Sequence, residues 1–358
     1  MKKLLIASTM ITGLALPATA DEISIMGWGG AYAKSHIEAY QKPYTAKTGT
    51  TVVSIDADNP AIPLKAQVEA NNVSMDIAVL EFADAVRYCD EGLLEVIDPA
   101  ILAPAPDGTP AMEDFLPGSV IDCMVPTDVW TTIIAYDSSK YAEGEAPGTL
   151  ADFFDLEKFP GKRGARKNAK VLLEMALMGD GVAPEEVYDL LETPEGVERA
   201  FAKLDTIKSE IVWWDAGAQA PQLLADGEVA LTMAYNGRIF NAMVAEDKPF
   251  DIIWDGQVYD VEGLVIPKGA PNIEKAKEFI VFATEAEQLA KAASWISYGP
   301  ARLSAGPLVG MYHDGSIEMA PNLPTSPDNM KNALFSGVEF WADRDAELNE
   351  QFNAWLLR

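Results

Sequence analysis

The chain has 358 residues, with 55 acidic against 27 basic side chains and a formal net charge of −28. So strong a negative charge disfavours partners such as nucleic acid or an anionic membrane, and it attracts cations. Beyond residue 20 no uninterrupted apolar run reaches about 18 residues, the length that a transmembrane helix needs. Composition therefore favours an exported or free-standing globular protein over a membrane protein or a nucleic-acid-binding protein.

Residues 1–20 are typical of a secretory signal peptide. Lys2 and Lys3 precede an apolar run, and the small residues 18–20 suit a cleavage site. The remaining chain is long enough for two domains with sizeable cores. We therefore predict a periplasmic protein, released from its signal peptide, and we expect a monomer.

Two cysteines, Cys89 and Cys123, occur in this exported chain. Outside the cytosol such a pair is expected to form a disulfide, and two buried free thiols are the alternative. The only histidines are His36 and His313. So few sulfur and imidazole ligands make a zinc site improbable, and we predict no metal and no cofactor.

The first part of the mature chain alternates strands and helices. Strand patterns at Glu22–Trp28, 51–54 and 76–79 precede helical patterns at 31–48, 60–71 and 82–91. This order predicts an α/β fold with a mostly parallel sheet and helices on both faces. Ligands of such sheets bind at the carboxyl ends of the strands. That rule places Trp28, Gly29, Gly30 and Glu81 at one edge.

Residues 127–136 are strongly β-forming and long enough to leave one domain and enter another. Residues 98–117 are expected to form a surface loop, because they are rich in Pro, Ala and Asp. The remaining expected elements are helices at 150–154 and 170–178, two helices within 184–208, strands at 229–234, 251–254 and 263–267, a long helix at 272–293 and a helical tail at 325–358.

Residues 211–238 combine two adjacent tryptophans with Asp215, a short helical pattern, a strand and the sequence Tyr-Asn-Gly-Arg. Aromatic rings beside a carboxylate suit the binding of an organic cation. In the alternative interpretation the tryptophans belong to the core and Asp215 is the N-cap of the helix. Adjacent side chains of an extended segment point to opposite faces, so either Trp213 or Trp214 would face a pocket.

Sequence motifs of catalysis and phosphate binding are absent. The chain has no GxxxxGK[ST], GxGxxG, HExxH or GxSxG pattern. We therefore predict a binding protein without catalytic residues. An extracellular hydrolase built on facing carboxylates is the alternative that the sequence leaves open.

Four segments together carry a resemblance to a known family: ISIMGWGGAY, LADGEVALTMAYNGR, YDVEGLVIPKGAPNIEKAKEFIVFA and WISYGPAR. In their order and spacing they resemble the periplasmic spermidine/putrescine-binding proteins of ABC importers. The resemblance implies a type II-like periplasmic-binding-protein fold with two α/β lobes and a cleft between them. It divides the chain into a first lobe (21–131 and 262–312) and a second lobe (132–261, with a helical tail at 313–358).

The resemblance also implies a function and a site. The protein would capture a polyamine or a related small amine and deliver it to an ABC permease in the inner membrane. Aromatic walls would come from Trp28, Tyr235 and Tyr298, and Glu262 would pair with an ammonium group of the ligand. The full set of expected ligand-binding residues is Trp28, Gly29, Glu81, Trp214, Asp215, Tyr235, Arg238, Glu262 and Tyr298.

This chain departs from the polyamine pattern in residues 166–171. Asn168 and Val171 stand where the family has two further acids, and Asp260 stands where it has an aromatic residue. These departures favour, as the alternative, an amino-acid derivative, an opine-like zwitterion or an organic anion. Its carboxylate would meet Arg166 or Arg238. For the basic loop of Arg163, Arg166 and Lys167, a solvated surface is the favoured interpretation and a ligand clamp the alternative.

Overall fold

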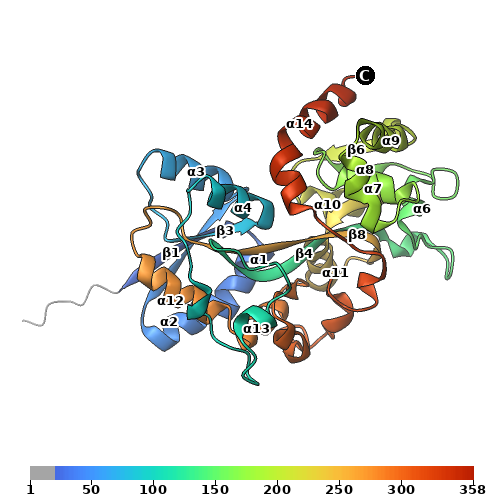
Figure 1. Ribbon diagram of the computed structural model, residues 1–358. Coiled ribbons are helices and arrows are strands. Elements are labelled where there is room, and N and C mark those ends of the chain that lie inside the picture. Colours follow the sequence, from blue (N-terminus) through green and yellow to red (C-terminus); the bar gives the residue numbers. More distant parts are fainter. Residues whose placement is uncertain (1–20) are drawn as a thin grey trace, which may run out of the picture.

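Two long strands run side by side through the middle of the molecule and join its two halves (Figure 1). These strands, β4 (Met124–Asp137) and β8 (Phe250–Val265), pair antiparallel in the computed structural model, which describes residues 21–358. β4 is rich in β-branched and aromatic residues, and every residue before Asp137 is buried. Such a composition suits a strand that is covered on both faces.

The amino-terminal half is built on three parallel strands. β1 (Glu22–Trp28) pairs with β2 (Thr51–Ala57) on one side and with β3 (Ile77–Glu81) on the other, and β3 pairs antiparallel with β8. The helices of this half are α1 (Ala31–His36), α2 (Lys42–Thr48), α3 (Ala61–Glu69), α4 (Phe82–Asp90), α5 (Ala111–Asp114), α12 (Ile273–Ala283) and α13 (Ala286–Ala293). A π-helical turn (Ile37–Gln41) joins α1 to α2.

The other half is built around β5 (Arg163–Arg166), which pairs in parallel with β6 (Ile211–Trp214) and β7 (Leu231–Tyr235). β7 in turn pairs antiparallel with β4. The helices of this half are α6 (Leu150–Phe154), α7 (Leu172–Gly179), α8 (Val187–Leu191), α9 (Pro194–Asp205), α10 (Gln219–Ala225), α11 (Asn236–Ala245) and α14 (Val338–Leu356).

The strands form one continuous sheet in the order β2-β1-β3-β8-β4-β7-β5-β6, with β9 (Gly299–Pro300) and β10 (Leu334–Phe335) added at β4 and β8. The predicted α/β class is thus confirmed, with parallel strands in the outer parts and antiparallel crossing strands in the middle. Hydrophobic core clusters fill both halves, and the largest one takes in much of α14. The domain boundaries given above stay a prediction.

Four expected elements differ in the structure, and the short helix α5 lies within the expected surface loop 98–117. The strands expected at 251–254 and 263–267 are one strand, β8, because Gly256 adopts a positive φ of 71° and the chain continues in the sheet. The helix expected at 272–293 is interrupted between α12 and α13. In the tail, helix begins only at Val338, since residues 334–335 pair with β8 as β10.

The predicted disulfide is confirmed. Cys89 and Cys123 are bonded, and their Cα atoms are 5.8 Å apart. The bond ties the end of α4 to the segment that enters β4. The predicted signal peptide, 1–20, lies outside the described residues. Within 21–358 no helix combines the length and apolar character that crossing a bilayer requires.

Candidate ligand-binding site

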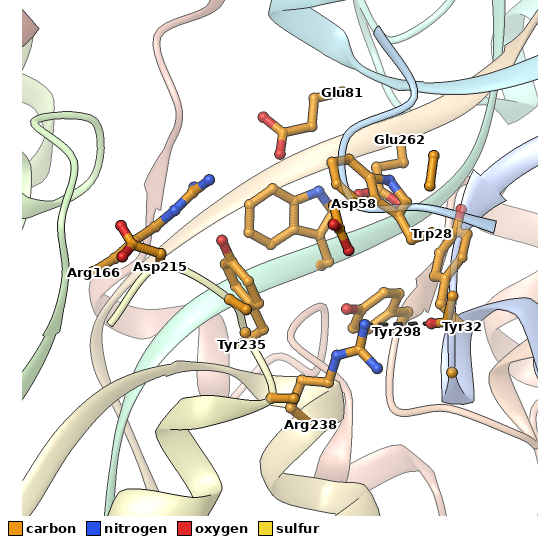
Figure 2. A pocket seen from close by; sticks show the side chains of 17 residues that line it. Trp28, Tyr32, Asp58, Glu81, Arg166, Asp215, Tyr235, Arg238, Glu262 and Tyr298 are labelled. Atoms are coloured by element: carbon orange, nitrogen blue, oxygen red, sulfur yellow. Dashed lines mark hydrogen bonds between the residues drawn. The ribbon is translucent and has the colours of Figure 1, made fainter. Parts of the chain in front are cut away.

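A cavity of about 530 Å³ lies where strands of the two halves end, a size typical of a small-molecule site. Figure 2 shows the side chains that line it. Eight of the nine residues expected to bind ligand line this cavity: Trp28, Gly29, Glu81, Asp215, Tyr235, Arg238, Glu262 and Tyr298. The structure therefore brings together residues from distant parts of the chain. Their contact with a ligand stays a prediction.

Three acidic residues lie in one row across neighbouring strands. Glu262 of β8 is directly opposite Glu81 of β3 on one side and Asp128 of β4 on the other. Directly opposite residues of antiparallel strands place their side chains on the same face. Asp128 accepts hydrogen bonds from the hydroxyl groups of Thr127 (2.8 Å) and Tyr32 (3.2 Å). The three carboxylates thus share one region but have different partners.

Glu262, like Asp128 beside it, has a buried carboxylate oxygen without a partner in the described chain. Its side chain is buried, at 5% exposure, and within residues 21–358 its Oε2 atom has no hydrogen-bond partner. Burial raises the pKa of the Glu262 carboxyl well above its ordinary value, and the charge of Asp128 raises it further. A buried acceptor without a partner costs free energy, which a ligand ammonium group would recover.

Aromatic rings surround this acid. Tyr32 packs against Tyr298 with ring centroids 5.9 Å apart, and Trp130 meets Tyr235 edge-on at 5.3 Å. Together with Trp28 they line the cavity. Aromatic faces attract organic cations and cover the methylene groups between them. The sequence analysis did not place Tyr32 or Trp130 here, although Tyr32 directly follows the Trp-Gly-Gly-Ala segment at the end of β1.

Arg166, the last residue of β5, supplies positive charge. Its guanidinium lies over the ring of Tyr235, 5.8 Å from the ring centroid. Within residues 21–358 it has no side-chain hydrogen bond and no ion pair, so its planar set of N–H donors is free to bind an anion. Figure 2 shows Arg166 and Glu262 on different sides of the cavity, with aromatic rings between them.

The three basic residues of the 163–167 segment have different roles. Arg163 is fully buried and donates hydrogen bonds to the carbonyl groups of Phe153, Asp155, Phe159 and Gly161. Arg166 lines the cavity, and Lys167 is exposed. The favoured interpretation of a solvated loop is therefore wrong for Arg163, which β5 carries into the core, while Arg166 at the end of β5 is half-buried beside the cavity.

Arg238, on the first turn of α11, approaches the loop between β1 and α1. Its guanidinium donates to the Gly29 carbonyl at 3.4 Å. Gly30 has a positive φ of 71°, and a Cβ atom there would lie 2.8 Å from a guanidinium nitrogen of Arg238. Both the backbone conformation and this close approach require glycine at position 30.

Lys170 is a further residue of this region that the sequence analysis missed. It lies just before α7, and its ammonium is 3.2 Å from Glu81 and 3.0 Å from Asp260. Burial opposes ionisation of Glu81, but the charges of Lys170 and Arg166 hold the pKa of this carboxyl below its ordinary value. Burial also opposes the charge of Lys170, yet Asp260 and Glu81 raise its pKa above the ordinary value. The sequence did contain a sign of this role, because Lys170 lies within residues 166–171, where this chain lacks the two acids of the family.

Neither tryptophan of β6 lines the cavity. Trp214 is buried in the core, and its ring meets Tyr235 edge-on with centroids 5.6 Å apart. Its expected place in the pocket is corrected to packing behind Tyr235. Trp213 points the other way, as alternation along a strand requires, and packs edge-on against Phe352 and Trp355 of α14.

Asp215 lines the cavity instead of capping α10. The side chain of Gln219 accepts hydrogen bonds from the backbone N–H groups of Asp215 and Ala216, both at 2.9 Å. The N-cap interpretation of Asp215 is therefore wrong, because the N-cap residue of α10 is Ala218 and no side chain of the described chain caps this helix. The Asp215 carboxylate is left beside the cavity.

Comparisons with known proteins establish the family of this chain. The model of the bacterial extracellular solute-binding proteins matches residues 39–325. The chain belongs to this family. It is 41% identical over 355 residues to the gamma-aminobutyric acid-binding protein of Pseudomonas aeruginosa, covering 97% of this chain and 95% of that protein. It is 25% identical over 253 residues to the spermidine/putrescine-binding periplasmic protein of Escherichia coli, covering 69% and 67%.

Solved structures show the same fold. The PBP MotA from A. tumefaciens, in complex with glucopine, has a TM-score of 0.82 at 28% identity, covering 94% of this chain and 99% of that one. A GABA receptor structure has a TM-score of 0.78 at 30% identity, covering 94% and 98%. The two-lobed fold and the resemblance to spermidine/putrescine-binding proteins are thus confirmed. This chain is therefore the substrate-binding protein of an ABC transporter.

Proposed function

We propose that this solute-binding protein captures a small zwitterion whose ammonium and carboxylate groups are separated by a short carbon chain. γ-Aminobutyrate is the simplest such ligand, and amino-acid derivatives of the opine type belong to the same class. The protein would bind it in the periplasm as a monomer and deliver it to its ABC permease without covalent change. Here the alternative ligand class of the sequence analysis replaces the polyamine as the leading hypothesis.

One observation carries this proposal. Glu262, which has a buried Oε2 atom without a partner, and Arg166, whose guanidinium has no ion pair, line the same cavity within the part of the chain that the structure describes. A negatively charged hydrogen-bond acceptor complements the ammonium end of a zwitterion. A positively charged hydrogen-bond donor complements its carboxylate end. Aromatic rings between them suit the methylene chain.

The pairing of Glu81 weakens the case for a polyamine. A diamine brings two ammonium groups, and of the four acids that line the cavity, Asp58, Glu81, Asp215 and Glu262, the one directly opposite Glu262 already pairs with Lys170. Arg166 and Arg238 add further positive charge beside the same space. The similar proteins whose names include GABA or glucopine support the zwitterion as well.

A thermal-shift panel of four-carbon ligands tests the proposal. Butylamine lacks the carboxylate of γ-aminobutyrate, butyrate lacks its ammonium group, and putrescine carries a second ammonium group in place of the carboxylate. We expect γ-aminobutyrate to raise the melting temperature by about 3 °C or more at saturation, with smaller shifts for the other three. A larger shift with putrescine would contradict the proposal, and chemical turnover of a ligand would favour the hydrolase.

A further inference from the structure

A buried ion triad stands next to the candidate site. The Lys170 ammonium, 11% exposed, lies 3.2 Å from the Glu81 carboxylate and 3.0 Å from that of Asp260, which is 3% exposed. The three residues come from the segment before α7, from the end of β3 and from β8. Lys170 also lines a smaller hollow beside the main cavity, and Glu81 and Arg166 line both spaces.

Lys170 changes how many negative charges the cavity can offer to a ligand. Glu81 and Glu262 are directly opposite each other on β3 and β8, so both carboxylates are on one face of the sheet. Without Lys170, these two acids would be unpaired neighbours, an arrangement that suits a ligand with two ammonium groups. With Lys170 in place, Glu81 is paired, and of these two acids only Glu262 lacks an ion-pair partner.

We propose that Lys170 is a specificity-determining residue whose ammonium takes the place of a second ligand ammonium, so that the site accepts zwitterions and excludes diamines. This inference rests on the proposed function, because it explains the choice between two ligand classes at the same site. Lys170 acts through Glu81 and Asp260, and the side chains that would face the ligand remain those of the cavity.

A purely structural role for the triad makes a different prediction. If Lys170 only tied the two halves together, its replacement would lower stability and weaken every ligand to a similar extent. If it excludes a second ammonium group, its replacement should reverse the preference between ligands. The ratio of two affinities measured on one variant therefore separates these roles, since a general loss of folded protein leaves the ratio unchanged.

The test is calorimetric titration of Lys170→Met with putrescine and with γ-aminobutyrate. We expect the affinity for putrescine to rise by about ten-fold or more, the gain typical of one charge-assisted hydrogen bond. The matched control is Lys167→Met, an exposed lysine three residues earlier. It should leave both affinities within about two-fold of the wild type.

Lys170→Met leaves two acids without their cation, and this variant could fail to fold. The double variant Lys170→Met/Asp260→Asn then tests the inference, because it leaves Glu81 as the only acid of the triad without its cation. A folded variant that gains no affinity for putrescine relative to γ-aminobutyrate would overturn the inference. That result would leave the proposed function intact if the wild type still binds γ-aminobutyrate. Conversely, the variant gains affinity for putrescine while the wild type binds no zwitterion if only the Lys170 inference is right. That result would support the exclusion of diamines by Lys170 and refute the proposed function.

Discussion

Glu81 and Glu262 lie directly opposite each other on β3 and β8, yet of the two only Glu81 has a cationic partner, the Lys170 ammonium 3.2 Å away. The two glutamates thus differ in whether their carboxylate is available to a ligand cation. One is neutralised by the protein itself, and the other has a buried oxygen without a partner in the described chain.

Glu262→Gln should weaken binding of γ-aminobutyrate by about 2–4 kcal/mol. The amide keeps the shape of the side chain but removes the charge that would face the ligand ammonium group. Isothermal titration calorimetry at pH 8 measures the loss. Glu228→Gln, at an exposed position, is the matched control and should change the affinity little. Equal affinities in the two variants would exclude Glu262 as the ammonium partner.

The same variant should stabilise the ligand-free protein at high pH. The folded pKa of Glu262 is raised, so above the unfolded value of about 4.3 the folded state retains a proton that the unfolded state has lost. Wild-type stability therefore falls as pH rises, by up to about 1.4 kcal/mol per pH unit until the folded pKa is reached. Glu262→Gln removes this loss. Urea unfolding at pH 4 and pH 8 should show a larger advantage of the variant at pH 8, and no change with pH would contradict the raised pKa.

Ligand binding should also release a proton. An ammonium group beside Glu262 favours the ionised carboxylate, which lowers the pKa that burial and Asp128 have raised. Affinity for γ-aminobutyrate should therefore rise with pH up to the folded pKa of Glu262. Titrations in two buffers of different ionisation enthalpy measure the proton. Release in the wild type but not in Glu262→Gln is the expected pattern, and proton uptake would oppose it.

Arg166→Met should discriminate between ligands. It removes the free guanidinium that lines the cavity, so γ-aminobutyrate should lose about 2–4 kcal/mol of binding free energy. Butylamine has no carboxylate and should bind the variant about as well as it binds the wild type. The two titrations on one protein serve as mutual controls. Equal losses for both ligands would instead indicate a structural role.

Removing the disulfide should lower stability without changing ligand preference. The bond between Cys89 and Cys123 closes a loop with a sequence separation of 34, and the chain-entropy model gives it roughly 3–4 kcal/mol. Cys89→Ser/Cys123→Ser should lose that amount in urea unfolding. Since neither residue lines the cavity, the affinity ratio of γ-aminobutyrate to putrescine should remain that of the wild type.

Features read from short segments were predicted well. The strand ends that carry Trp28 and Glu81, the disulfide and the α/β class follow from local patterns and from the rule that ligands bind at carboxyl ends of strands. Lys170 could not be found this way, because its partners lie 89 and 90 residues away along the chain. The role of Trp214 depended on which face of a four-residue strand is covered, and packing behind Tyr235 decides that.

Central to the proposed function is that Glu262 and Arg166, which line one cavity, together select a zwitterion. Calorimetric titration of the wild-type mature chain with γ-aminobutyrate and with putrescine, at the same pH and ionic strength, tests it most directly. The account predicts that γ-aminobutyrate binds at least about ten-fold more tightly, since each charged end gains a charge-assisted hydrogen bond. Equal or tighter binding of putrescine would contradict it.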